Sequence, residues 1–286
     1  MTLRVFLYDC PAANALRVHE LADFLASELG DRVAVEVRPE FFAFTRPGAE
    51  VAARFAACKV RYPSKAPPES LAAKPLFQEV EYEKRRLAGK ANAAGILYDG
   101  ERYVAALRDL LPASEHSLDD VHLVVTNQLV GTYGEGDGRY HARVIVAGFP
   151  AVLSTTGLVE GPAKPREFYR AKARHQQMFT GVPVDMLADA FGDAILRPDD
   201  PRTTEALKGY AMMAVLHQAT GEGFCPHEEC ALFNAHWQAE LVRAQLGARE
   251  HRFCARHRAL IASLGASSRP ASPRAASRRG TAPARG

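Results

Sequence analysis

Hydrophobic and polar positions at the start of the chain follow first a strand pattern and then a helix pattern. Residues 4–8 form a short apolar run typical of a strand, and residues 15–29 carry apolar side chains at helical spacing. A second strand is indicated at residues 33–37, where every other residue is valine. The order of strand, helix and strand predicts the beginning of an α/β layer.

A proline-rich stretch follows this layer. Residues 62–75 contain several prolines and few large apolar side chains, so we expect a loop there. Helical stretches are predicted on either side of the loop, at residues 49–57 and 77–87.

A second group of strands is predicted in the middle of the chain. Residues 121–126, 142–146 and 151–155 are rich in β-branched and other apolar side chains. The three glycines within residues 133–138 predict a hairpin turn. From Pro165 onward the pattern becomes helical.

The clearest helix is expected to begin at Asp200 and to end at Gly221. Asp200 is a good capping residue, and a proline follows it at the first helical position. Four residues at helical spacing form a stripe that we expect to face the interior: Leu207, Tyr210, Ala214 and His217. A last helix is predicted from the N-cap Asn234 to about Leu246.

Charge is unevenly distributed along the chain. The 286 residues include 36 lysines and arginines and 33 acidic residues, for a formal net charge of +3. Residues 266–286 hold five of the arginines and no acid, and they lack large apolar side chains. A disordered basic tail is therefore predicted at residues 265–286. The rest of the chain lacks a basic surface interleaved with aromatic residues, so contact with nucleic acid is expected only through this tail.

The sequence also bears on location and on the state of the cysteines. No stretch approaches the ~20 apolar residues of a membrane-spanning helix, and the N-terminal segment lacks the pattern of a secretion signal. We therefore expect a cytoplasmic protein that does not bind membranes. An odd number of cysteines in that compartment argues against a disulfide framework and leaves thiols available for a metal. The five are Cys10, Cys58, Cys225, Cys230 and Cys254.

Four of the sulfur and nitrogen donors form two closely spaced pairs. Cys225 and Cys230 are separated by four residues, and Cys254 and His257 by two. Pairs at this spacing are typical of structural zinc sites, because a tight loop then directs two donors at one ion. We predict a structural Cys₃His zinc site, with no open position for water. Two histidines near the first pair, His227 and His236, remain alternative ligands, and the competing interpretation is three small buried cysteines and a surface histidine.

The same residues carry a resemblance to a known family. Archaemetzincins, zinc metallopeptidases, combine the motif H-E-x-x-H-x-x-G-x-x-H with a following C-x₄-C-x-M and a later C-x-x-C. Here Cys225-x₄-Cys230-x-Leu232 and Cys254-x₂-His257 are similar to the cysteine part of that pattern. The likeness spans roughly residues 118–257 and is closer to an uncharacterised set of archaemetzincin-related proteins. It includes two sequence segments, Gly148-Phe149-Pro150-Ala151-Val152 and Asn234-Ala235-His236-Trp237-Gln238.

This sequence departs from the family at the catalytic motif. Counting back from Cys225, the three metal histidines and the general-base glutamate of the family fall on Ala214, Val215, Gln218 and Phe224. None of these side chains can take over the metal and proton chemistry of a zinc peptidase. The resemblance therefore implies the fold and the structural zinc of the family without its catalytic residues, as in a pseudoenzyme.

We expect an α/β fold with three regions. An N-terminal α/β region covers residues 1–112, and residues 113–264 form an archaemetzincin-like region with a zincin-like mixed sheet, helices and the zinc site. The tail covers residues 265–286.

Three classes of function remain open. The preferred hypothesis is a non-proteolytic relative of the metallopeptidases that keeps a structural zinc. The second is a metal-dependent, peptidase-like hydrolase with an unrecognised centre, and the third is a regulator that binds a partner or nucleic acid. The residues that could build such an unrecognised centre are His217, Glu222, His227 and Glu228, with His122 or His141.

Overall fold

The computed structural model describes the chain from residue 3 to residue 264, with short gaps. The described ranges are residues 3–31, 33–67, 69–71, 74–90, 95–177 and 188–264. The predicted tail at residues 265–286 lies outside them. No helix among the described residues is long and apolar enough to cross a bilayer.

A five-stranded sheet forms the centre of the molecule. Its order is β2-β1-β4-β8-β7, and all neighbours are parallel except β7, which runs antiparallel to β8 at the edge. All seven residues of β4 are buried, as is typical of a strand covered on both faces. The strands are β1 (Arg4–Tyr8), β2 (Ala34–Arg38), β4 (Asp120–Thr126), β7 (Ile145–Val146) and β8 (Ala151–Ser154).

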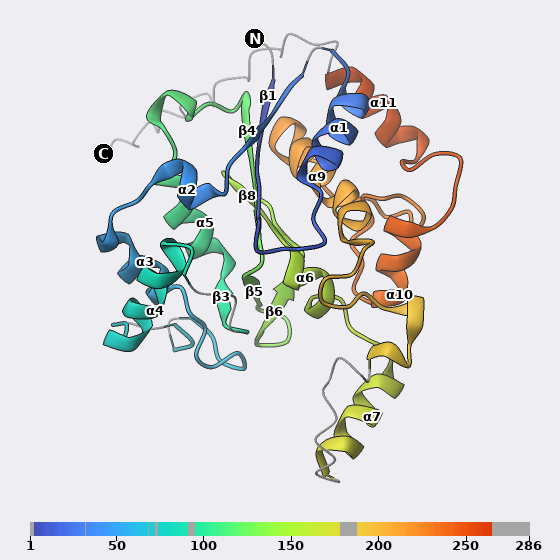
Figure 1. Ribbon diagram of the computed structural model, residues 1–286. Helices are drawn as coiled ribbons and strands as arrows, with labels where there is room; N and C mark the ends of the chain where they lie inside the picture. The colour runs from blue at the N-terminus through green and yellow to red at the C-terminus, as the bar shows by residue number, and fades with distance from the viewer. Residues whose placement is uncertain are drawn as a thin grey trace, which may run out of the picture.

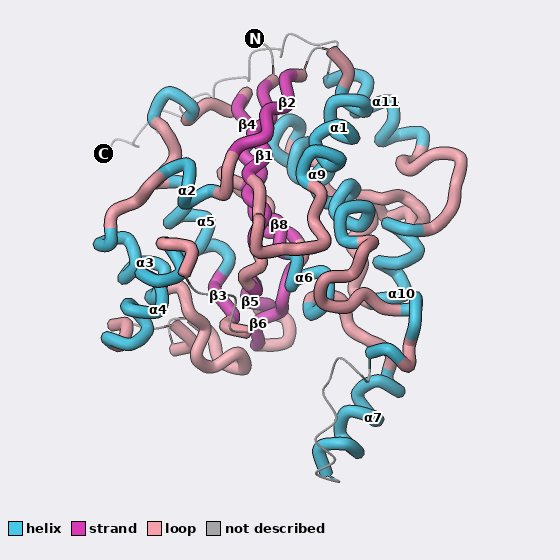
Figure 2. The backbone as a smooth tube through the Cα atoms, in the orientation of Figure 1, coloured by secondary structure: helices cyan, strands magenta, loops and turns pink. Residues whose placement is uncertain are grey.

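Helices cover both faces of this sheet (Figures 1 and 2). On one face, the side chains of Val5 and Leu7 join a large core with α1 and α9. On the other face, Phe6 and Tyr8 join an aromatic core with α2, α3 and α5. The alternation along β1 thus assigns successive residues to two different cores. The helices are α1 (Val18–Leu29), α2 (Phe41–Thr45), α3 (Ala52–Ala57), α4 (Phe77–Leu87), α5 (Gly100–Arg108), α6 (Thr155–Glu160), α7 (Arg166–Gln177), α9 (Thr203–Thr220), α10 (Gln238–Leu241) and α11 (Ala255–Leu264).

Short helical turns fill several of the connections. The chain has three 3₁₀ turns and one π-helical turn among its described residues. They are η1 (Ala49–Val51), η2 (Ala113–Glu115), η3 (Gly192–Ala194) and the π-helical η4 (Val242–Leu246).

A second, three-stranded sheet has the order β3-β5-β6. It consists of β3 (Leu97–Asp99), β5 (Leu129–Gly134) and β6 (Arg139–Arg143). The predicted hairpin turn at residues 133–138 joins β5 to β6. Strand β5 is not predicted by the sequence pattern, because its residues include two glycines. At Gly131 a Cβ atom would lie 2.6 Å from the backbone oxygen of His141, so close strand packing accounts for this glycine.

Most of the predicted elements are confirmed, with shifted boundaries. The α/β class is confirmed, and β1 and α4 have the predicted ranges. The segment predicted as one strand at residues 142–146 belongs to β6 and β7, which are in different sheets. The helix predicted from Asn234 begins instead at Gln238, because the Glu240 carboxylate accepts hydrogen bonds from the backbone N–H groups of His236 and Trp237.

The prediction that His217 faces the interior is wrong. Helix α9 is buried through most of its length, and Leu207, Tyr210 and Ala214 lie in the core as expected. The helix leaves the core in its last turn, so His217 is exposed and Gly221 ends the helix with a φ of 80°.

The predicted regions share the central sheet. Strands β1 and β2 come from region 1–112, and β4, β7 and β8 come from region 113–264. The division between these regions stays a prediction.

Candidate metal centre

The first ligand pair lies in a tight loop between α9 and α10. The backbone N–H of Cys225 donates to the carbonyl of Leu232 at 2.8 Å, and the N–H of Cys230 donates to the carbonyl of His227 at 3.0 Å. These bonds hold the chain in a turn that brings the two thiols to the same side. The turn packs against α9 at Gly209, where a Cβ atom would lie 2.4 Å from the carbonyl oxygen of Ala231.

The second pair lies at the start of α11. Cys254 directly precedes the helix, and His257 is three residues further on, so both side chains leave the same side of the first turn. The backbone N–H of Ala231 donates to the carbonyl of Arg252 at 3.0 Å, which ties the second segment to the first.

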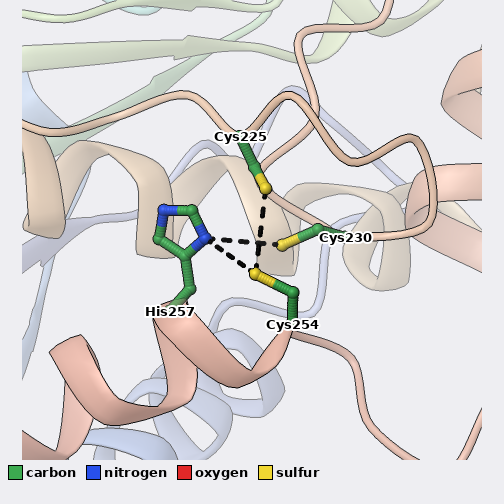
Figure 3. A group of neighbouring side chains, drawn as sticks. All are labelled: Cys225, Cys230, Cys254 and His257. Carbon is green, nitrogen blue, oxygen red and sulfur yellow. Dashed lines mark hydrogen bonds between the residues drawn. The ribbon is translucent and has the colours of Figure 1, made fainter.

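The four side chains converge on one point (Figure 3). Their ligand atoms, three sulfurs and one imidazole nitrogen, all lie within 4.8 Å of one another. The Sγ atoms of Cys225 and Cys254 are 3.9 Å apart, and the Nδ1 atom of His257 lies 3.2 Å from Cys254 Sγ and 3.9 Å from Cys230 Sγ. Tetrahedral zinc with ~2.3 Å bonds to sulfur and ~2.0 Å bonds to nitrogen separates its ligand atoms by about 3.5–3.8 Å. The geometry therefore fits a zinc ion, and the group is a candidate zinc site.

The site is enclosed by protein. Cys225, Cys230 and His257 are buried, and Cys254 is partly buried. The cysteines are free, and the 3.9 Å between the sulfurs of Cys225 and Cys254 far exceeds the ~2.05 Å of a disulfide bond. The Nε2 atom of His257 is buried without a hydrogen-bond partner, which leaves Nδ1 as the nitrogen directed at the thiols.

Burial and hydrogen bonding have different effects on the three thiols. Burial raises the pKa of Cys225 to about 12 and also raises the pKa of Cys230. Burial acts in the same direction on Cys254, but hydrogen bonds from the backbone N–H of His257 and from neighbouring groups outweigh it and lower the pKa of this thiol. Burial lowers the pKa of His257, which favours the neutral imidazole that binds metals. A zinc ion would displace the remaining thiol protons and compensate the thiolate charges.

The alternative ligands lie elsewhere. His227 and His236 are exposed and do not belong to the group, so the structure brings together the predicted set of three cysteines and His257.

The residues considered for an unrecognised centre do not gather. Glu222 pairs with Arg256, and Glu228 pairs with Arg243 at 2.6 Å. His141 pairs with Asp137, while His122 is buried on the aromatic side of the sheet. Within the ranges that the structure describes, the Cys₃His set is the only group of three or more potential metal ligands.

The positions of the family's catalytic motif lie along and after α9. Ala214 and Val215 are buried in the core. The side-chain amide of Gln218 donates to the backbone oxygens of Leu118 and Asp120, which fastens the end of α9 to the start of β4. Phe224 is exposed at the wall of a cleft.

Sequence reasoning missed this cleft, which has a volume of about 780 Å³. Its walls come from α5, β5, β6, β7, the end of α6 and the segment after it, α7, α9, the loop after α9 and the segment before α10. Three of the exposed aromatic side chains line it: Tyr169, Phe224 and Trp237, with exposed fractions of 49%, 51% and 45%. The cleft could not be recognised in the sequence, because its walls come from segments that are far apart along the chain.

Comparisons with known proteins give two similar structures. One is a zinc-dependent peptidase from Methanocorpusculum labreanum, 13% identical, with a TM-score of 0.44 over 90% of this chain and 99% of that chain. The other is archaemetzincin from Methanopyrus kandleri, 14% identical, with a TM-score of 0.45 over 92% of this chain and 95% of that chain. No curated protein matches the sequence. A family of unknown function, DUF7001, matches residues 6–260, and the chain belongs to this family.

Proposed function

We propose that this chain is a non-proteolytic binding protein that uses zinc as a structural ion. The observation that carries the proposal is the enclosed Cys₃His group, whose four donors would fill all positions of a tetrahedral zinc ion. A catalytic zinc needs a position open to water or substrate, and this donor set leaves none.

In this proposal, the thiolates of Cys225, Cys230 and Cys254 and the Nδ1 atom of His257 hold the ion. Zinc would supply a crosslink between the loop after α9 and the start of α11. The loop forms part of the packing of α9, and α11 packs against α1. The crosslink would thus join the end of α9 to α11, which itself packs against α1.

The binding surface in this proposal is the 780 Å³ cleft. Strand β7 lines the cleft and lies at the edge of the main sheet, where its outer side pairs with no strand of the described residues. An unpaired edge offers backbone donors and acceptors to an extended peptide, and neighbouring aromatic side chains can pack against the peptide's apolar residues. Extended peptide segments are therefore the ligand class that this cleft suits.

The single tryptophan of the chain makes a direct test available. Trp237 lines the cleft, so its intrinsic fluorescence should change when a peptide binds. We expect purified protein to contain one zinc per chain by elemental analysis. We also expect saturable fluorescence changes with members of a random peptide library, and no cleavage of those peptides by mass spectrometry.

Two results would contradict the proposal. One is peptide cleavage that scales with protein concentration and depends on a second, exchangeable metal ion. The other is a library in which no peptide changes the fluorescence of Trp237 or binds by calorimetry.

A further inference from the structure

The cleft contains a positive charge without a carboxylate partner. Arg143 is the last residue of β6 and lines the cleft with a partly buried side chain. Its Nε–H group donates to the hydroxyl of Thr132 at 2.8 Å. Within the described part of the chain, no carboxylate forms an ion pair with its guanidinium group. Burial lowers the pKa of Arg143, and the nearby charge of Asp137, which pairs with Arg139 and His141, acts against this only without contact.

The two buried arginines among the described residues are each neutralised by a carboxylate. Arg38 forms a two-pronged pair with Glu115, with distances of 2.8 and 2.9 Å. Arg86 pairs with Glu83 at 2.6 Å. Arg143 is partly buried and has no ion pair, so its guanidinium group keeps N–H donors free for a ligand in the cleft, whereas the charges of Arg38 and Arg86 are neutralised within the fold.

A second polar group in the cleft also lacks a partner. Tyr210 of α9 lines the cleft, is 3% exposed, and its hydroxyl has no hydrogen-bond partner. Burial raises the pKa of Tyr210, so the hydroxyl stays protonated and can donate a hydrogen bond. Arg143 and Tyr210 approach the same cleft from two different elements.

The other charges of the cleft favour a single carboxylate over a polyanion, because Arg139, the other arginine there, already pairs with Asp137. Glu101 and Glu160 also line the cleft, and Glu160 pairs with Lys164 at 3.3 Å. These two acids would repel the clustered charges of phosphates or nucleic acids. One carboxylate needs only one guanidinium group, which can bind both of its oxygens.

The position of Arg143 in the sheet suggests where that carboxylate comes from. Strand β7 begins two residues after Arg143 and is only two residues long, Ile145–Val146. So short an edge can pair with the end of a peptide but not with a long continuous strand. We propose that Arg143 binds the free C-terminal carboxylate of a peptide whose last residues lie along β7. This inference rests on the proposed function, and it adds that the cleft recognises the C-terminal end of the bound peptide.

The test compares each peptide that binds in two forms, as a free acid and as a C-terminal amide. Binding is measured by the fluorescence of Trp237 and by calorimetry on the full-length, zinc-loaded protein. We expect amidation to weaken binding by about 10-fold to 100-fold, the usual effect of losing a charge-assisted hydrogen bond.

Variants of the cleft provide the matched controls. Arg143→Met should abolish the preference for the free acid, and Arg143→Lys should keep a smaller preference, because lysine retains the charge but not the two-pronged geometry. Arg139→Met is the control, since Arg139 lies on the same strand, lines the same cleft and already pairs with Asp137 at 2.8 Å. Arg139→Met should keep the preference.

Tyr210→Phe separates a binding role from a structural one. Removing a buried hydroxyl without a partner should not lower the melting temperature, whereas it should weaken binding of the free acid. Zinc content and melting temperature of each variant show whether the fold is intact.

The possible failures are distinguishable. Equal binding of the two forms by the wild type, or a preference that survives in Arg143→Met, overturns this inference and leaves the proposed function standing. Preference for an internal aspartate or glutamate over a free C-terminus overturns the assignment to the chain end. Absence of any peptide binding contradicts the proposed function itself.

Discussion

Two fully buried histidines in this chain show how similar burial can serve different chemistry. His122 lies in β4, and both of its ring nitrogens have partners: Nδ1 with the Tyr8 hydroxyl at 3.0 Å and Nε2 with the backbone oxygen of Glu115 at 3.3 Å. His257 lies among three thiols, and its Nε2 atom has no partner. The first is a core histidine whose hydrogen bonds are satisfied inside the fold. The second is arranged to bind something that lies between it and the sulfurs.

The largest effect expected from this comparison is at the thiols. Cys225→Ser should lose zinc and lower the melting temperature by at least ~10 °C. Several kcal/mol of metal binding is coupled to folding, and 1 kcal/mol corresponds to roughly 2–4 °C in a protein of this size. Elemental analysis and calorimetry measure both quantities.

The control for this variant is Cys58→Ser. Cys58 is buried in the aromatic core, and its thiol donates to the carbonyl of Arg54, a bond that serine can keep. This variant should retain zinc and lose only about 1 kcal/mol of stability. If Cys225→Ser keeps its zinc and melts at the wild-type temperature, the three thiols and His257 do not bind the ion. His257 would then not differ from His122 as a metal ligand.

A smaller effect is expected for His122, as a dependence of stability on pH. Burial lowers the pKa of His122 to about 4, from an ordinary value of 6.5. The unfolded chain therefore takes up a proton as the pH falls through 6.5, while folded His122 stays neutral until about pH 4. The contribution of His122 to stability is complete above pH 6.5 and is lost between pH 6.5 and 4, and by pH 5 the loss amounts to about 2 kcal/mol.

Urea unfolding at pH 7 and pH 5 tests this expectation. The fall in unfolding free energy between the two pH values should be about 2 kcal/mol smaller in His122→Phe than in the wild type. His19→Gln, which changes an exposed histidine of α1, should leave the fall unchanged. An identical pH dependence in wild type and His122→Phe would show that His122 is not held neutral by its surroundings.

The smallest effect is expected for a third histidine. His217 is exposed, so His217→Ala should change the unfolding free energy by less than about 0.5 kcal/mol. Its neighbour Leu216 is fully buried, and Leu216→Ala should cost about 2–5 kcal/mol. Chemical denaturation of both variants measures the difference. A large loss of stability in His217→Ala would mean that α9 stays buried beyond Leu216.

The zinc site could be predicted from the sequence because most of its geometry is local. A spacing of four residues in a loop and of two at a helix start already directs each pair of donors, so only the meeting of the two pairs required the fold. The error at His217 has a different origin. Helical spacing identifies the stripe to which a residue belongs, but it does not show where along its length a helix leaves the core.

The cleft depended on long-range structure. The lack of a carboxylate partner at Arg143 is visible only when the contacts of β5, β6 and α9 are known together. Likewise, β5 is obscured by glycines that strand packing requires and that a local pattern counts against a strand.

The packing of α11 on α1 bears on how the protein is made. The rings of Phe24 in α1 and Phe253 just before α11 have centroids 6.4 Å apart, and the two helices are in contact. During synthesis, α1 leaves the ribosome long before α11. Strand β1 likewise gains its second neighbour in the sheet only after β4 has been synthesised. The emerging chain therefore carries an unfinished apolar surface for most of its translation, and chaperones that shield nascent chains should bind it during that interval.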